Sequence, residues 1–532
     1  MLVKRVPPRY CWPVCRLWKE GEIAISGNLL FGPARTPKII IVGAGFSGIG
    51  LGVLLKKARI ETFTIYEKAE SVGGTWWHNQ YPGAEVDSVS HVYSFAFKAH
   101  AWSRTHAKQT EIHSYLDETV DEFGIRSHLH LGTAVKSATW DDRSQTYNVT
   151  LSNGEKTECH VLVGATGFLN IPRYPTWPGL ESFAGPKFHT SRWEHQHDLE
   201  GKSVAVVGTG STATQIVPEL AGVVKKLYLF QREPGWVVPK GERDYTSDES
   251  SRLSKPLINR IQRLKWFWAT EKRLWRGALF RPGTANNEAA RQVALDFIEK
   301  ELSDRPDLMK AVTPDYPYWG KRLIMNSTYY AALKHPNVEL IPRAVVSVTP
   351  TGLVDIDGVE RNVDVLVIAT GFRTSDYLGT FELRGSDGLS LQEYWAGEPS
   401  AFLGMTVPTF PNFYVMYGPG TNGGEIVSML MRQAEHIVRS VKWMSRKGIS
   451  ALEVKPTWAN MYDAWLQGQV NVTTWAVSDN YYKSSTGKIV TQWPYGPGMY
   501  GLLVRMFGLH SQRARPRVEG LVEVERTTKF PS

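Results

Sequence analysis

Cysteine is nearly absent from this chain, whose 532 residues include only Cys11, Cys15 and Cys159. That number is too small for a disulfide framework, and the spacing does not suit a four-ligand metal site. No Cys-x-x-Cys pair occurs either, which excludes the dithiol chemistry of disulfide reductases. We therefore predict a reducing, cytoplasmic location and no metal site.

Long apolar segments are also missing. The longest uncharged stretches are residues 39–55, which are rich in glycine, and residues 399–424, which contain four prolines. Neither is typical of a membrane-spanning helix. The first 37 residues lack the apolar centre of a secretory signal, because prolines and charged residues interrupt it. The sequence thus predicts a soluble protein without a transmembrane segment.

Positive charge is in moderate excess, and most of the excess lies near the chain ends. The 61 Lys and Arg against 52 Asp and Glu give a net charge of +9, to which residues 1–38 contribute +5 and residues 505–532 contribute +3. A basic surface dedicated to nucleic acid is therefore not indicated. Hydrophobic residues make up 42% of the chain, which excludes a disordered protein, and the length of 532 residues exceeds one core, so we expect three or four modules.

A first dinucleotide-binding unit begins near residue 38. The β-branched run 38–42 ends in a glycine-rich turn, and an apolar helical pattern follows to Leu55. Such glycines allow a tight turn, a close approach of backbone N–H groups to a pyrophosphate, and close packing of helix on strand. The turn residues assigned to the cofactor are Gly43, Gly45, Phe46, Ser47 and Gly48. Glu67 ends the next predicted strand and would bind an unphosphorylated ribose, which favours FAD.

A second unit repeats the pattern with one change. The run 203–207 leads into a glycine turn, and residues 226–230 form the matching second strand. The turn residues assigned to a cofactor are Gly208, Thr209, Gly210, Ser211, Thr212 and Ala213. Arg232 occupies the position of Glu67, since each follows the first glycine of its turn by 24 positions. Because arginine can clamp a phosphate bidentately, the second unit favours NADPH.

A duplicated strand end indicates how the units are connected. Residues 161–168 and 365–372 share the pattern Val-Leu-Val-x-Ala-Thr-Gly-Phe, a buried strand followed by a glycine turn. We predict an α/β fold with two Rossmann-like dinucleotide-binding domains, the NADPH domain inserted in a discontinuous FAD domain, plus a helical subdomain. The predicted boundaries are 1–35 for an N-terminal extension, 36–168 and 371–510 for the FAD domain, 169–240 and 321–370 for the NADPH domain, 241–320 for the helical insertion, and 511–532 for a C-terminal tail.

Two motifs outside the glycine turns indicate a family. Residues 183–193 carry the pattern Phe-x-Gly-x-x-x-His-x-x-x-Trp, and residues 73–87 contain Gly-Gly-Thr-Trp and end in Asp. In these motifs the chain resembles the Baeyer-Villiger monooxygenases, over residues 36–510. The first motif ordinarily continues with Pro or Asp, where this chain has Glu194, but Trp193 is the residue of the ketone-oxidising branch.

The resemblance also implies roles for single residues. The family pattern of a Lys-Arg pair ahead of two tyrosines is found here as Lys321 and Arg322. By resemblance, Arg322 is the catalytic arginine, Asp87 its carboxylate partner, and Lys321 a second contact to the NADPH 2′-phosphate beside Arg232. From the motif at 73–87 the resemblance adds Gly74, Thr75, Trp76, Tyr81 and Asp87 to the cofactor-binding residues.

The activity implied by the resemblance is that of an FAD-containing, NADPH-dependent monooxygenase. NADPH reduces FAD, O₂ then forms a C4a-peroxyflavin, and a ketone becomes an ester or lactone. Arg322 stays protonated at any working pH and would stabilise the peroxide and the following oxyanion. The alternative for Arg322 and Asp87 is an ordinary ion pair at a domain interface. Expected partners are a small lipophilic ketone and O₂, with no nucleic acid, and we expect a monomer or weak oligomer.

Two other functions stay open at this point. An N- or S-oxygenating flavin-containing monooxygenase would use the same cofactors, and Glu194 is the feature that favours it. A non-enzymatic flavoprotein that senses redox state or binds nucleic acid is the more remote alternative, suggested by the basic tails and one basic interior segment.

That interior segment comprises residues 252–281, with nine Lys or Arg against a single acid, Glu271. Its apolar positions recur at helical spacing and include Leu257, Ile261, Leu264, Trp268 and Trp275. The pattern predicts a basic amphipathic helix. Such a helix fits either the solvated surface of a helical insertion or peripheral contact with an anionic membrane.

Overall fold

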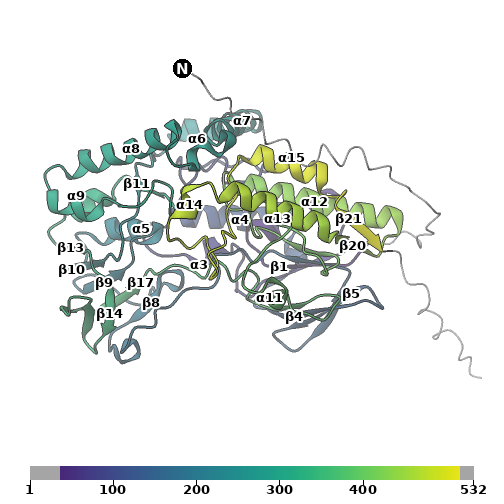
Figure 1. The fold of residues 1–532 in the computed structure, drawn as a ribbon, viewed down its shortest axis with the longest axis horizontal. Helices are drawn as coiled ribbons and strands as arrows, with labels where there is room; N and C mark the ends of the chain where they lie inside the picture. Colours follow the sequence, from purple (N-terminus) through teal and green to yellow (C-terminus); the bar gives the residue numbers. More distant parts are fainter. Residues whose placement is uncertain (1–35, 516–532) are drawn as a thin grey trace, which may run out of the picture.

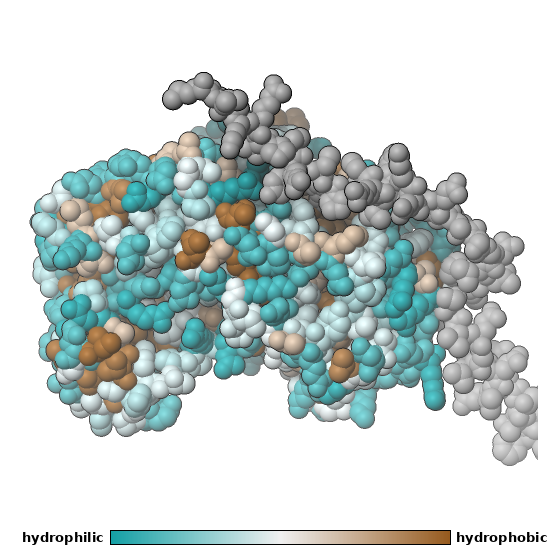
Figure 2. Space-filling view, in the orientation of Figure 1, coloured by the Kyte–Doolittle hydropathy of each residue, from teal (hydrophilic) through white to brown (hydrophobic). Residues whose placement is uncertain are grey.

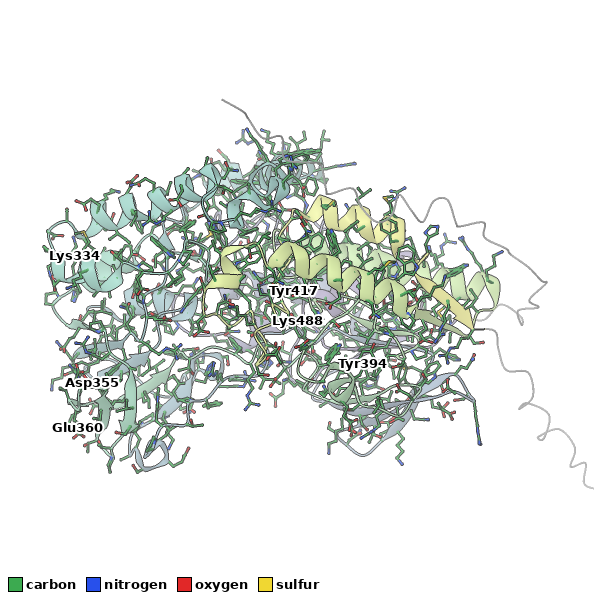
Figure 3. All side chains as sticks on the ribbon, in the orientation of Figure 1. Lys334, Asp355, Glu360, Tyr394, Tyr417 and Lys488 are labelled. Atoms are coloured by element: carbon green, nitrogen blue, oxygen red, sulfur yellow. The ribbon has the colours of Figure 1, made fainter. Side chains whose placement is uncertain are left out.

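The computed structural model describes residues 36–515, which form two neighbouring regions built on sheets, with helices along one side of the molecule (Figure 1). The predicted N-terminal extension, residues 516–532, Cys11 and Cys15 lie outside the described residues. A notch separates the two regions at the lower edge of the space-filling view (Figure 2). Asp355 and Glu360 mark the outer edge of one region, whereas Tyr417 lies near the centre, between the two (Figure 3).

The first sheet has five parallel strands in the order β19-β7-β1-β2-β3. The bounds are β1 Ile39–Val42, β2 Phe63–Tyr66, β3 Leu129–His130, β7 Val161–Gly164 and β19 Phe413–Val415. β1 is buried along its whole length, as expected of a β-branched strand in the middle of a parallel sheet. β19 pairs with β7, so a C-terminal segment completes a sheet that the N-terminal part of the chain began.

Helices cover this sheet. α2 (Phe46–Lys57) follows β1 and packs against the long helix α12 (Ile426–Lys447). α2 is apolar on nearly all sides because the sheet lies on one side of it and α12 on another. A smaller four-stranded sheet has the order β18-β4-β5-β6, with bounds β18 Glu382–Arg384, β4 Val135–Asp141, β5 Thr146–Leu151 and β6 Lys156–Cys159.

The second sheet also has five parallel strands, in the order β13-β10-β9-β17-β8. The bounds are β8 Lys187–His189, β9 Ser203–Val207, β10 Lys226–Phe230, β13 Val338–Ile341 and β17 Val365–Ile368. α5 (Ser211–Leu220) follows β9, as α2 follows β1. The antiparallel strands β14 (Val345–Val348), β15 (Gly352–Asp355) and β16 (Glu360–Asn362) extend this region outward (Figure 1).

A helical segment separates β10 from β13 in the sequence and runs along the upper edge of the molecule (Figure 1). It consists mainly of α6 (Ser247–Ser254), α7 (Pro256–Arg273), η4 (Trp275–Phe280), α8 (Ala285–Leu302) and α9 (Pro306–Val312). Within residues 36–515, no helix is both long enough and apolar enough to cross a membrane.

The remaining elements are α3 (Thr75–His78), α4 (Gln109–Glu122), η1 (Arg126–His128), η2 (Leu180–Ser182), η3 (Thr190–Arg192), β11 (Val237–Val238), β12 (Ile324–Met325), α10 (Tyr329–Leu333), α11 (Leu391–Trp395), β20 (Ala451–Val454), α13 (Pro456–Val470), α14 (Thr474–Val477), α15 (Pro497–Phe507) and β21 (Gln512–Arg515).

Candidate active site

The turn between β1 and α2 requires glycine at two positions. Gly43 has a φ of +111°, and a Cβ there would lie 2.6 Å from the carbonyl oxygen of Ala165. A Cβ on Gly48 would lie 1.9 Å from the carbonyl oxygen of Gly43, so the helix could not lie this close to the turn. Gly45 is the N-cap of α2, and no side chain caps the helix. The first backbone N–H groups of α2 are therefore available to an anion such as a pyrophosphate.

Glu67 follows β2 and is almost fully buried, with 6% of its surface exposed. Its Oε2 accepts a hydrogen bond from the backbone N–H of Ala44 (2.8 Å), and its Oε1 accepts one from that of Ala69 (2.9 Å). The carboxylate thus holds the glycine turn in place. Since a carboxylate offers about four acceptor positions, Glu67 retains capacity for ribose hydroxyls.

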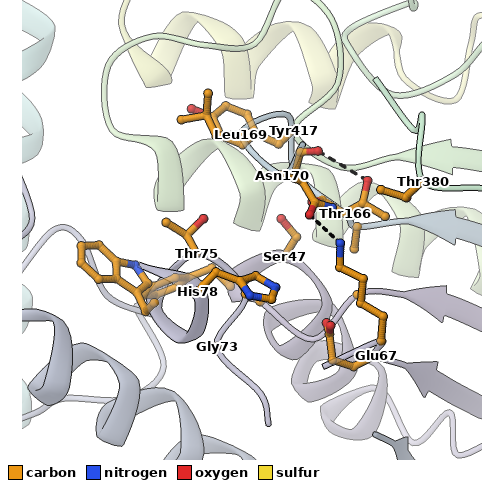
Figure 4. A pocket seen from close by; sticks show the side chains of 18 of the residues that line it. Ser47, Glu67, Gly73, Thr75, His78, Thr166, Leu169, Asn170, Thr380 and Tyr417 are labelled. Carbon is orange, nitrogen blue, oxygen red and sulfur yellow. Dashed lines mark hydrogen bonds between the residues drawn. The ribbon is translucent and has the colours of Figure 1, made fainter. Parts of the chain in front are cut away.

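A first cavity of about 150 Å³ opens beside this turn (Figure 4). Of the predicted residues, those that line it are Gly43, Gly45, Phe46, Ser47, Glu67, Gly74, Thr75 and Trp76. Gly48 lies behind the wall, where it permits packing. Lys68 also lines the cavity, and its Nζ donates to the Oδ1 of Asn170 (2.8 Å). The uncapped helix, the bare glycine backbone and the buried carboxylate fit the pyrophosphate and ribose of FAD.

The turn between β9 and α5 repeats the geometry of the first. Gly208 has a φ of +119°, and a Cβ there would lie 2.4 Å from the carbonyl oxygen of Ala369. Gly210 is the N-cap of α5, again without a side-chain cap. Gly208, Thr209, Gly210, Ser211 and Thr212 line a second cavity of about 930 Å³, whereas Ala213 lies in the core behind it.

Positive side chains line the second cavity near this turn. Arg232 is exposed and makes no ion pair within residues 36–515. Lys321 forms an ion pair with Glu233, and its Nζ lies 4.9 Å from the centre of the Tyr316 ring. Two cations within one cavity fit a 2′-phosphate. The sequence pattern did not identify Glu233, whose negative charge lies beside Lys321.

Arg322 and Asp87 form an ion pair at the wall of the second cavity. The Nη2 of Arg322 lies 2.8 Å from the Oδ2 of Asp87. The arginine side chain is 42% exposed although protein surrounds it, because it faces the cavity. Burial acts to lower the pKa of Arg322, but Tyr481 and Asp87 outweigh that effect and hold the pKa above its ordinary value. The cavity therefore contains a permanently charged guanidinium.

Tyr81 connects the motif at residues 73–87 to the second unit. Its hydroxyl donates to the Oε1 of Gln215 on α5 (2.9 Å), and the Nε2 of Gln215 donates to the carbonyl of Glu85 (2.9 Å). Tyr81 lines the second cavity. This contact fixes the segment carrying Asp87 against the helix that follows the second glycine turn.

The two cavities share walls. Thr75, Trp76, Tyr93 and Tyr417 line both of them, and the indole Nε1 of Trp76 donates to the hydroxyl of Tyr93 (3.1 Å). Burial raises the pKa of Tyr93 to about 12. The wall that the two cavities share thus contains hydroxyl, amide, aromatic and aliphatic side chains.

Comparisons with known proteins decide the family. A model of the pyridine nucleotide-disulphide oxidoreductase family matches residues 40–266. A Baeyer-Villiger monooxygenase of Pseudomonas aeruginosa is 35% identical over 493 residues, which cover 91% of this chain and 93% of that protein. The chain belongs to the Baeyer-Villiger monooxygenase family.

Solved structures of Baeyer-Villiger monooxygenases and similar enzymes share this fold. The NADP⁺-bound cyclohexanone monooxygenase of Rhodococcus sp. Phi1 has a TM-score of 0.81 at 29% identity, covering 91% of this chain and all of the other. A complex of OTEMO with FAD and NADP has a TM-score of 0.81 at 26% identity, with the same coverage. The predicted family, α/β fold, monooxygenase class and cofactor pair are confirmed, and the ketone-oxidising function is favoured over the two alternatives.

Disulfide chemistry, which is part of the name of the matching family model, would need a pair of thiols, and residues 36–515 contain none. Within residues 36–515 the one cysteine is Cys159, which is fully buried, and burial raises the pKa of its thiol to about 12. A thiol with this pKa is a poor nucleophile at neutral pH. This Baeyer-Villiger monooxygenase therefore shares the dinucleotide-binding architecture of that family without the dithiol.

Two histidines in and near the motif at residues 183–193, His189 and His197, have structural partners. His189 is fully buried, and its Nε2 lies 3.0 Å from the carbonyl of Gly371, which joins β8 to the segment after β17. Burial lowers the pKa of His189 to about 4, so it is neutral at physiological pH. His197 pairs with Glu194 at 3.0 Å.

Several wall residues of the second cavity escaped the sequence prediction. Tyr481 and Tyr482 lie beside Arg322, and Trp475, whose ring contacts that of Tyr482, lines the same cavity. They follow no glycine turn and belong to no spacing pattern. Their only signal is the aromatic density of the segment around residues 475–482.

Proposed function

We propose that this Baeyer-Villiger monooxygenase binds FAD at the first glycine turn and NADPH at the second, and that a lipophilic ketone reacts beside Arg322. The observation that carries the proposal is the Arg322–Asp87 pair at 2.8 Å in the cavity that shares its walls with the FAD site. A permanent positive charge in an enclosed site stabilises negative oxygen wherever it develops.

Each cofactor would be held by groups that line its cavity. The amides of the first turn and of α2 would bind the FAD pyrophosphate, and Glu67 would bind the adenosine ribose. Arg232 and Lys321 would bind the 2′-phosphate of NADPH. When bound, the flavin supplies hydride acceptance and oxygen activation, chemistry that no side chain provides.

Side chains of the second cavity would contact the ketone and the oxyanion formed from it. Arg322 would donate hydrogen bonds to the oxyanion that forms when the ketone is attacked, and it would keep its proton throughout. Asp87 would orient the guanidinium. Leu274, Phe280 and Trp475 give the cavity apolar walls suited to the hydrocarbon part of a ketone, the class of compound after which the cyclohexanone monooxygenase is named.

The domain boundaries predicted from the sequence belong to the same proposal. The first sheet takes strands from residues 39–164 and 413–415, which supports a discontinuous FAD domain. The second takes strands from either side of the helical segment, which supports an insertion inside the NADPH domain. The cytoplasmic location and the monomeric or weakly oligomeric state remain predictions.

Arg322→Ala tests the catalytic assignment. We expect product formation to fall about 10²- to 10³-fold, while NADPH still reduces the flavin, because the charge acts on the oxygen chemistry. Ester carrying ¹⁸O from ¹⁸O₂ is measured by mass spectrometry, and flavin reduction by its absorbance without oxygen. Arg343→Ala at saturating NADPH is the control, since it removes another cavity-wall arginine paired with an aspartate, Asp357. Undiminished ester formation by Arg322→Ala would remove Arg322 from this role.

A further inference from the structure

The helix α7 presents its apolar side chains to the outside. The exposed fractions are 71% for Leu257, 45% for Ile261, 50% for Leu264 and 66% for Trp268, and Trp275 at the start of η4 is 69% exposed. The first four follow the spacing i, i+4, i+7 and i+11, so they form one stripe along the helix. An amphipathic helix that packs only within its own protein buries its apolar stripe against the core, whereas α7 leaves its stripe exposed.

Polar contacts on the opposite side explain this orientation. Asn259 is 5% exposed, and its amide lies 3.2 Å from the Nδ1 of His91. The Nη1 of Arg263 donates to the backbone oxygen and to the hydroxyl of Ser94, both at 3.0 Å. These bonds hold the polar side of α7 against the protein and so fix the apolar stripe outward. At the C-terminal end of the helix, Glu271 accepts a hydrogen bond from the backbone N–H of Gly498 (2.5 Å), which ties α7 to the start of α15.

Basic side chains border the stripe. Arg260, Lys265 and Lys272 are exposed on α7, and Lys255 and Arg276 are exposed at its two ends. Glu271 is the sole acid between residues 250 and 287, and it points inward to Gly498. An apolar stripe of Leu, Ile and Trp between exposed Lys and Arg complements a surface that is apolar inside and anionic outside, as a bilayer with acidic lipids is.

The same segment reaches the second cavity. Arg273 and Leu274, at the end of α7, line that cavity together with Phe280 of η4, and Trp275 lies outside between them in the chain. The outer apolar surface and the inner apolar wall are thus formed by one continuous stretch of residues. α7 lies at the upper edge of the molecule (Figure 1).

We propose that α7 and η4 dock on the surface of an anionic lipid bilayer, and that lipophilic ketones dissolved in the bilayer reach the second cavity past Trp275. The docking rests on the surface alone, whereas the delivery of ketones rests also on the proposed function. Docking and delivery are therefore measured separately.

Docking is tested by co-sedimentation of the full-length holoenzyme with vesicles. We expect binding to vesicles of phosphatidylcholine with roughly 30% phosphatidylglycerol, at least about tenfold weaker binding to phosphatidylcholine alone, and loss of binding as salt rises. The double variant Leu264→Glu/Trp268→Glu should lose the binding. The matched control is Ile356→Glu/Val359→Glu, which alters two apolar residues of similar exposure, 63% and 48%, in the distant β15–β16 turn.

Three outcomes would overturn the docking: no sedimentation of the wild type, equal sedimentation of the Leu264→Glu/Trp268→Glu variant, or equal loss in the control. A wild type that stays in solution with vesicles and dimerises in analytical ultracentrifugation, while the variant is monomeric, would assign the stripe to contact between copies instead.

Delivery is tested with two ketones. The Leu264→Glu/Trp268→Glu variant should oxidise a water-soluble ketone at the wild-type rate, since neither residue lines the first or the second cavity. Its turnover of a long-chain ketone held in anionic vesicles should fall at least about fivefold. Unchanged turnover of the vesicle-held ketone would overturn the delivery. Failure of both ketones in the wild type would contradict the proposed function and leave the sedimentation result standing.

Discussion

The two glycine turns are nearly identical in backbone and opposite in charge. Gly43 and Gly208 have φ values of +111° and +119°, and a Cβ on either would strike the carbonyl of the alanine that follows the neighbouring strand. Yet Glu67 in the first unit is 6% exposed with both oxygens bonded, while Arg232 in the second is exposed at a cavity wall. In the proposed function, one backbone conformation would therefore serve two cofactors.

The difference shows how selectivity is divided between backbone and side chain. In the proposed binding mode, the turn and the uncapped helix would bind a pyrophosphate, which FAD and NADPH have in common. The residue 24 positions after the first glycine would meet the ribose, where the cofactors differ. Glu67 also supports its own turn, so its loss should affect folding as well as binding. Arg232, in contrast, has no ion-pair partner within residues 36–515 and holds no other segment in place.

The largest effects are expected from adding a methyl group to either turn. In Gly43→Ala the Cβ meets the Ala165 oxygen at 2.6 Å in a left-handed backbone, which costs about 1–2 kcal/mol before the clash is counted. We expect this variant to purify without FAD and without activity. Gly208→Ala should stay yellow but lose NADPH oxidation. FAD content is measured by absorbance after denaturation.

The control for the methyl group is Gly154→Ala. Gly154 also has a positive φ, +87°, but nothing lies within 4 Å of its added Cβ. It should keep FAD and NADPH oxidation, because it carries the backbone strain without the contact. Loss of FAD from Gly208→Ala would contradict the independence of the two turns.

Glu67→Gln and Arg232→Gln should differ in their effect on stability. The glutamine at 67 places an NH₂ group against one of two backbone N–H donors, and we expect the free energy of unfolding to fall by about 1.5–3 kcal/mol. At exposed Arg232 the change should stay within about 0.5 kcal/mol. Urea unfolding of both variants, with FAD in excess, measures the difference. Equal stability would mean that Glu67 does not support the turn.

Arg232→Ala should change the choice of nicotinamide cofactor. Loss of a charge-assisted contact worth about 1.5–3 kcal/mol lowers kcat/KM for NADPH roughly 10- to 100-fold and leaves NADH almost unaffected. Steady-state oxidation of both cofactors measures the ratio. Arg143→Ala, which removes an exposed arginine outside both cavities, should leave it unchanged. An equal loss with NADPH and NADH would refute the 2′-phosphate assignment.

The sequence predicted what is local and left out what is assembled from distant segments. The strand, turn and helix around Gly43 and Gly208 follow from a few consecutive residues, so they could be predicted. Tyr481 and Tyr482 could not, because they reach Arg322 from a segment with no motif of its own. The Arg322–Asp87 contact spans 235 positions and was expected only through the family resemblance.

The amphipathic pattern of α7 shows a second limit. Its spacing predicted a helix with one apolar stripe, and the structure has such a helix over Pro256–Arg273, with Trp275 in the following element η4. The pattern does not say which side faces the protein, since that depends on polar partners elsewhere in the chain. Here Arg263 bonds to Ser94, and the stripe faces outward.

The smallest effect is expected at Glu233, the acid that follows Arg232 and pairs with Lys321. Its carboxylate would repel the 2′-phosphate that Arg232 attracts, and it keeps Lys321 engaged. Glu233→Gln should therefore lower the KM for NADPH about two- to fivefold, the scale of a partly exposed ion pair, and leave NADH unchanged. The sign is opposite to that of Arg232→Ala. Because screening weakens the repulsion, the gain should shrink as ionic strength rises, and a KM that rises instead would mean that Glu233 orients Lys321 for binding.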